Sequence, residues 1–167
     1  ASYHLGRLYE AQGRVEDAFA AYDKLARNAS RPIEAKARLA GVTLALRDRT
    51  IERKAAFLVI AGDVFDGAWR DLRTGLVFAE AMARLEREGI AAVLLKGNHD
   101  AESRIGKALH YGANVQLFDS RRAHTIRLDS HQIALHGRSY AKPDETRNLV
   151  LDYPEALPGW FNVGVLH

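Results

Sequence analysis

Residues 57–66 read FLVIAGDVFD, and residues 91–100 read AAVLLKGNHD. Each stretch begins with an unbroken apolar run, which is typical of a strand buried on both faces of a parallel sheet. Between them, residues 72–87 form a predicted helix that ends before Gly89. Its apolar side chains recur at helical spacing, at Leu76, Ala79, Met82, Ala83 and Leu85. A strand, a helix and a second strand in this order predict a right-handed βαβ unit with parallel strands.

Polar side chains follow both predicted strands. Gly62-Asp63 ends the first strand, and Gly97-Asn98-His99-Asp100 ends the second. Each loop begins with a glycine, which permits a sharp turn just outside the strand. His167 closes the last predicted strand of the chain. Because ligands of a parallel α/β sheet gather at the carboxyl ends of its strands, an aspartate, an asparagine and two histidines are expected at one edge.

The region after residue 100 predicts a short helix and three more strands. The helix is expected over residues 102–109, and the strands are expected over residues 124–128, 132–136 and 162–166. The predicted fold class is therefore α/β, with helices flanking a partial β-sheet.

The first 49 residues follow a different pattern, with three helical segments separated by turns, the third over residues 33–47. Their packing positions resemble those of a tetratricopeptide repeat, at Leu5-Gly6, Tyr9, Gly13, Ala18 and Tyr22. The repeat's tryptophan-type and proline-type positions hold Ser2 and Ser30 instead. A generic amphipathic helical hairpin explains the pattern as well. We therefore expect a helical segment over residues 1–49 and an α/β domain over residues 50–167.

Composition limits the chemistry of any site. Apolar residues make up 47% of the 167 residues and charged residues 27%, as in ordinary globular proteins. Cysteine is absent, so disulfides and thiolate metal sites are excluded and a reducing, cytoplasmic location is expected. No apolar run has the length of a membrane span. The net charge of +3 is weak evidence for a nucleic-acid partner, because the basic residues are spread along the chain.

The two loops carry a resemblance to a known family. Gly62 to Asp66 has the pattern G-D-x-x-D, and Gly97 to Asp100 reads G-N-H-D. Together, one βαβ unit apart, they resemble the calcineurin-like metallophosphoesterases. The wider text resembles the bacterial DNA-repair exonucleases of the SbcD-like type, in the segments LVIAGDVFDGAWRD (58–71), VLLKGNHDAESRI (93–105), IALHGRSY (133–140) and FNVGVLH (161–167). The resemblance covers residues 51–167 and implies a metallophosphoesterase-like fold.

The resemblance implies a role for each matching residue. Asp63 would bridge two metal ions, and Asn98 and His167 would be ligands of the second ion. His99 would contact the phosphate and protonate the leaving oxygen. Asp100 would hold His99 in the required tautomer.

Three further residues have open roles. Arg104 is expected either to reach the substrate phosphate or to pair with Glu102. His136, at a strand end, either faces the site or is structural. Asp66 is either a site residue or a turn or helix-cap residue.

Two motifs of the family are missing from the sequence. The family domain begins with a strand ending in D-x-H and closes its site with a late G-H-x-H, whereas this chain has a helical segment before Asp63 and stops at His167. We therefore expect a domain without its first strand and its C-terminal part. Its second metal would keep three of four protein ligands, and its first metal would keep only Asp63. The prediction is one weak site for a divalent ion, Mn²⁺ before Mg²⁺, and low activity of this chain.

Three hypotheses about function follow. The first is metal-dependent phosphodiester hydrolysis of the DNA-exonuclease type, for which the resemblance implies DNA and an ATPase subunit as partners. The second is a non-catalytic module whose helical segment binds a peptide or protein. The third is a fragment whose missing strands come from another chain. Whether this chain is an enzyme is left open by the sequence.

Overall fold

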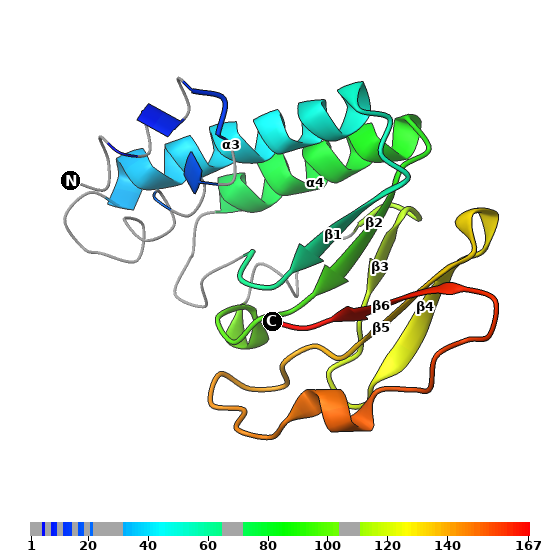
Figure 1. Cartoon of the computed structure of the whole chain (residues 1–167). Helices are drawn as coiled ribbons and strands as arrows, with labels where there is room; N and C mark the ends of the chain where they lie inside the picture. Colours follow the sequence, from blue (N-terminus) through cyan, green and yellow to red (C-terminus); the bar gives the residue numbers. More distant parts are fainter. Residues whose placement is uncertain are drawn as a thin grey trace.

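The computed structural model describes residues 32–64, 72–103 and 111–167, together with Leu5, Leu8, Tyr9, Gln12–Arg14, Asp17, Ala18 and Ala21. This part of the chain forms three layers (Figure 1): a pair of helices, a first sheet and a second sheet. The helices are α3 (Pro32–Glu52) and α4 (Leu72–Arg87), and they pack side by side.

The first sheet is parallel and has the strand order β1-β2-β3. Its strands are β1 (Phe57–Ala61), β2 (Ala91–Leu95) and β3 (Val115–Leu117). The second sheet has the order β4-β5-β6, with an antiparallel pair β4–β5 and a parallel pair β5–β6. Its strands are β4 (His124–Leu128), β5 (Ile133–Gly137) and β6 (Phe161–Val165). Short 3₁₀ turns connect these elements, at η1 (Asp100–Glu102), η2 (Asp129–His131) and η3 (Leu149–Asp152).

The first sheet is buried on both faces because its side chains alternate between two cores. Leu58 and Ile60 of β1 face the helices, where they pack against the cluster of Phe78, Ala81, Met82 and Leu85 from α4. Val59 faces the other way, toward a cluster that includes Val93, Leu95, Phe118, Ile126, Leu135 and Val165. The apolar runs in the sequence are thus explained by a sheet sandwiched between helices and a second sheet.

The register of the first sheet brings the two predicted loops together. Phe57 pairs with Ala91, and Ala61 pairs with Leu95, so β1 and β2 run in the same direction and end at the same level. The loop that begins at Gly62 therefore starts one strand away from the loop that begins at Gly97.

Most predicted elements are confirmed. The α/β class, the parallel βαβ unit, and the bounds of β1, α4, β2 and β4 agree with the structure. Strands β5 and β6 lie one residue from their predicted positions, and α3 extends beyond the predicted 33–47 to Glu52.

Other expectations were wrong or fall elsewhere. Strand β3 was not predicted. Leu76 was named among the apolar residues at helical spacing in α4, but 63% of it is exposed, whereas Phe78 and Ala81 are buried. Of the helix expected over 102–109, residues 104–109 lie outside the described part of the chain, and Asp100–Glu102 is a 3₁₀ turn.

The tetratricopeptide-like pattern falls partly, at Gly6 and Tyr22, outside the described residues. Within them, Ala18 is fully buried in the core on the helical side of the first sheet, and Tyr9 packs against the same cluster. The boundary expected between residues 49 and 50 falls within α3. In the described parts of the chain, no helix combines the length and the apolar character that a membrane span needs.

Candidate metal centre

The turn after β1 adopts a backbone conformation that few residues accept. Gly62 has a φ of +97° and Asp63 a φ of +56°, so two successive residues are in the left-handed region. A Cβ at Gly62 would collide with the ring of His167 and would lie 2.9 Å from the Cα of Gly97. Glycine is needed here both for its conformation and for its small size, and the turn carries Asp63 against the neighbouring loop.

Three side chains converge at the carboxyl edge of the first sheet. The Nε2 atom of His167 lies 3.1 Å from the Oδ1 atom of Asn98 and 3.5 Å from the Oδ1 atom of Asp63. The side chains of His167 and Asp63 keep 24% and 16% of their surface exposed, so solvent reaches the cluster. The structure therefore brings together the three residues for which the sequence predicted a metal role.

The hydrogen bond made by the other ring nitrogen of His167 sets the tautomer of the imidazole. Its Nδ1 atom lies 2.8 Å from the backbone oxygen of Ala61, which can only accept a hydrogen bond. Nδ1 therefore carries the proton, and in the neutral ring Nε2 presents a lone pair to the oxygens of Asn98 and Asp63. Through this lone pair Nε2 can bind a cation, whereas a protonated ring would donate from Nε2 to the two oxygens.

This donor set fits a divalent cation. A carboxylate oxygen, an amide oxygen and a neutral imidazole nitrogen suit hard or borderline divalent ions. Within the described ranges, no three histidine, aspartate or glutamate side chains gather closely enough to hold a metal by themselves. The cluster therefore includes the amide of Asn98, a neutral oxygen donor, beside one carboxylate and one imidazole.

The two remaining residues of the second loop contact the first loop. The backbone N–H of His99 donates to Oδ1 of Asp63 at 3.2 Å. Asp100 is 6% exposed, and its Oδ2 atom accepts from the backbone N–H groups of Val64 and Gly97 at 3.2 and 3.0 Å. The roles predicted for His99 in proton transfer, and for Asp100 in holding its tautomer, stay predictions.

Aromatic residues that the sequence analysis did not single out hold His167. The ring of Tyr140 meets that of His167 edge to face, with centroids 5.6 Å apart. The hydroxyl of Tyr153 donates to the backbone oxygen of Val165, two residues before His167, at 2.5 Å. Burial raises the pKa of the Tyr153 hydroxyl, which stays protonated for this task. Tyr140 lies in the quoted IALHGRSY segment, but no periodicity or spacing pointed to its position.

A buried serine joins the two sheets behind the cluster. The hydroxyl of Ser139 donates to the backbone oxygen of Phe118 at 2.6 Å and accepts from the backbone N–H of Lys96 at 2.9 Å. The next residue, Tyr140, donates its backbone N–H to the oxygen of Lys96 at 2.9 Å. Because Lys96 directly precedes Gly97-Asn98, these bonds fix the base of the second loop.

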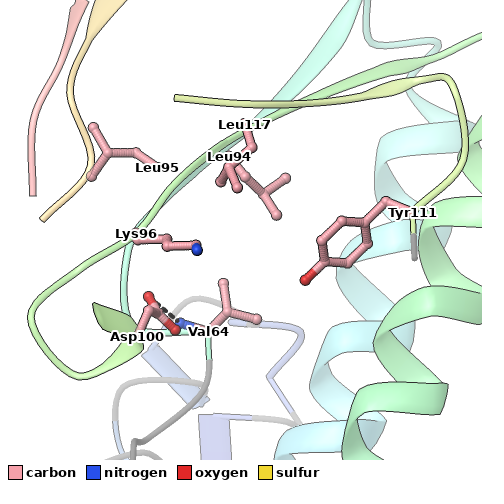
Figure 2. Close-up of a pocket in the computed structure, with 7 residues that line it drawn as sticks. All are labelled: Val64, Leu94, Leu95, Lys96, Asp100, Tyr111 and Leu117. Carbon is pink, nitrogen blue, oxygen red and sulfur yellow. Dashed lines mark hydrogen bonds between the residues drawn. The ribbon is translucent and has the colours of Figure 1, made fainter. Parts of the chain in front are cut away.

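A small pocket lies behind the second loop, on the side of the helices (Figure 2). Its walls are mainly apolar, and they carry the amine of Lys96, the carboxyl of Asp100 and the phenol of Tyr111. Burial, and secondly the charge of Asp100, raise the pKa of Tyr111 to about 12. The phenol is therefore a neutral donor at any physiological pH.

His136 does not join the metal cluster. It is 5% exposed, and its Nδ1 and Nε2 atoms lie 2.8 Å from Oγ1 of Thr125 and 2.8 Å from Oδ1 of Asn162. Its neighbour Leu135 belongs to the core between the sheets, so His136 points to the opposite face of the second sheet. Both ring nitrogens of His136 therefore have hydrogen-bond partners within the second sheet, which agrees with a structural role for this residue. Asp66 and Arg104 lie outside the described residues.

Two comparisons with known proteins point to one family. The family model described as calcineurin-like phosphoesterase matches residues 36–162. The chain is 28% identical over 123 residues to a Bacillus subtilis (strain 168) protein named uncharacterized metallophosphoesterase YhaO, which covers 72% of this chain. The matched region spans 30% of the length of that relative.

Proposed function

The chain belongs to the calcineurin-like phosphoesterase family, and from this membership we propose that it hydrolyses phosphodiester bonds with a divalent cation, with DNA as its substrate class. The observation that carries the proposal is the convergence of Oδ1 of Asp63, Oδ1 of Asn98 and Nε2 of His167. The choice of DNA is supported by the segments that resemble the SbcD-like exonucleases. On the same basis we propose an ATPase subunit as partner and Mn²⁺ as the preferred ion.

We assign a separate role to each residue of the cluster and of the loop beside it. Asp63, Asn98 and His167 would hold the cation. When bound, a divalent cation supplies Lewis-acid chemistry, since it polarises a phosphoryl oxygen and lowers the pKa of water. His99, on the same loop as Asn98, would donate the proton that the leaving oxygen needs. No covalent bond between protein and substrate is required.

The proposal can be tested with the purified chain after treatment with a chelator. Titration calorimetry with Mn²⁺ should show binding at a single weak site. Hydrolysis of a phosphodiester chromogen, of a phosphomonoester chromogen and of short DNA should then be compared with and without Mn²⁺. Slow metal-dependent cleavage of the diester and of DNA is expected, and metal-independent cleavage would contradict the proposal.

An asparagine pair supplies the matched control. Asn98→Ala removes a predicted ligand and should abolish both binding and cleavage. Asn148→Ala makes the same chemical change at an exposed position, where the side chain caps η3 by accepting from the backbone N–H of Val150. If the two variants lose binding equally, Asn98 is no ligand and the proposed centre fails.

A further inference from the structure

Each loop of the candidate metal centre carries a carboxylate that accepts a backbone hydrogen bond from the other loop. Asp63 of the first loop accepts the N–H of His99 from the second loop, at 3.2 Å. In return, Asp100 of the second loop accepts the N–H of Val64, which lies 36 residues earlier in the chain, at 3.2 Å. The same Oδ2 atom accepts the N–H of Gly97, at 3.0 Å. Each loop is thus bonded to the backbone of the other through a side-chain oxygen.

These bonds lie where they fix the start of each loop. Val64 directly follows Asp63, and Gly97 directly precedes Asn98. One atom of Asp100 therefore holds the backbone beside both of these residues. Hydrogen bonds to an ionised carboxylate are about twice as strong as those between neutral groups. Because Asp100 is 6% exposed, water can scarcely replace these two backbone N–H donors.

We propose that Asp100 is a positioning residue whose Oδ2 atom clasps the two loops and sets the distance between Asp63 and Asn98 before any cation binds. The role in cation binding rests on the function proposed above, whereas the clasp itself does not. With the loops held by protein groups alone, cation binding would not have to order them.

The clasp and the tautomer role implied for Asp100 predict different effects of replacing Asp100 by asparagine. Asn in place of Asp100 keeps an oxygen that can accept both backbone N–H groups but loses the negative charge. Under the clasp, Asp100→Asn should keep both bonds in a weaker form and should lose less than Asp100→Ala. Ala in place of Asp100 keeps neither property and should open both bonds.

The first experiment measures amide exchange by NMR in the whole chain without metal. In the wild type, the amides of Val64, Gly97 and His99 should be protected. Asp100→Ala should speed exchange at Val64 and Gly97 by about 10-fold or more, and leave the amides of β4 and β5 unchanged. The control is Asp129→Ala, which removes an exposed carboxylate that bonds Arg127 at the opposite end of the second sheet.

The second experiment measures Mn²⁺ affinity by calorimetry. Asp100→Ala should weaken binding about 10–100-fold, the usual cost of removing a residue that supports metal ligands. Asp100→Asn should weaken it less than about 10-fold, because the acceptor remains. Asp129→Ala should bind as the wild type does.

Each result bears on one part of the proposal. Unchanged exchange at Val64 and Gly97 in Asp100→Ala would overturn the clasp, and faster exchange with unchanged affinity would overturn its role in positioning. Equal losses in Asp100→Asn and Asp100→Ala would favour the tautomer role. If Asp100→Ala does not fold, unprotected Val64 and Gly97 amides in the wild type still refute the clasp. A wild type that binds no Mn²⁺ while these amides are protected refutes only the proposed function.

Discussion

The Nδ1 atom of His167 lies 2.8 Å from the backbone oxygen of Ala61, the last residue of β1. This contact joins β6 to β1 and turns the second ring nitrogen toward Asp63 and Asn98. A histidine held in this way is preorganised as a ligand, because its tautomer and its orientation are both fixed.

His167→Ala should therefore weaken Mn²⁺ binding by at least about 10–100-fold, since it removes a nitrogen ligand and the contact that orients it. Calorimetry on the metal-stripped protein measures the change. His131→Ala is the matched control, because His131 is an exposed residue of the η2 turn whose ring bonds the hydroxyl of Ser130. Equal affinities of the two variants would show that His167 is not a ligand.

Gly62→Ala should disrupt the centre without replacing any proposed ligand. The new methyl group would collide with the ring of His167, and the φ of +97° is unfavourable for alanine. We expect a destabilisation of about 1–3 kcal/mol or more by urea unfolding, together with loss of Mn²⁺ binding.

Gly159→Ala separates the two causes of that loss. Gly159 has a φ of +77°, but a Cβ there would meet nothing within 4 Å. This variant should show the conformational cost alone and should bind Mn²⁺ like the wild type. If Gly62→Ala binds Mn²⁺ equally well, the close approach to His167 has no bearing on the site.

The sequence predicted the parts of this molecule that depend on local patterns. The apolar runs predicted β1 and β2, and the helical spacing of apolar residues predicted α4. The glycine and polar residues after both strands predicted that Asp63 and Asn98 lie at one edge of the sheet. Strand β3 was missed because Val115–Leu117 is too short to show a period. Leu76 follows the helical spacing yet is exposed, because spacing gives the angle between residues but not which side of the helix meets the sheet.

The contacts that complete the site are not local. Ser139, Tyr140 and Tyr153 act through partners in other strands, so no spacing within their own segment indicates their roles. The bonds from Asp100 to Val64 and Gly97 depend on the registry of β1 with β2 and on the left-handed turn at Asp63. Residues of this kind are found from coordinates, since their partners are set by the packing of distant segments.

Ser139→Ala should destabilise the protein by about 1–3 kcal/mol, because it leaves the partly buried N–H of Lys96 and the buried oxygen of Phe118 without their shared partner. Urea unfolding measures the change. Ser130→Ala removes a hydroxyl that bonds only at the exposed surface, and it should cost less than about 0.5 kcal/mol. Equal costs would mean that Ser139 does not join the sheets in solution.

The phenol of Tyr111 predicts a loss of stability at alkaline pH. Its pKa is about 12 in the folded protein, chiefly through burial and secondly through the charge of Asp100, whereas a tyrosine in an unfolded chain ionises near 10. The unfolded chain therefore releases this proton first as the pH rises. The stability that the group contributes is present below about pH 10 and is lost between about pH 10 and pH 12.

Urea unfolding of the wild type and of Tyr111→Phe at about pH 9 and about pH 11 measures this contribution, because phenylalanine has no proton to release. The variant should lose less stability than the wild type between the two pH values. A phenolate absorbance titration should likewise lose its highest-pH component in Tyr111→Phe, and Asp100→Asn should shift that component to lower pH. A Tyr111 that titrates near pH 10 in the folded protein would show that the phenol is not buried beside Asp100, and that the pocket behind the second loop is open to water.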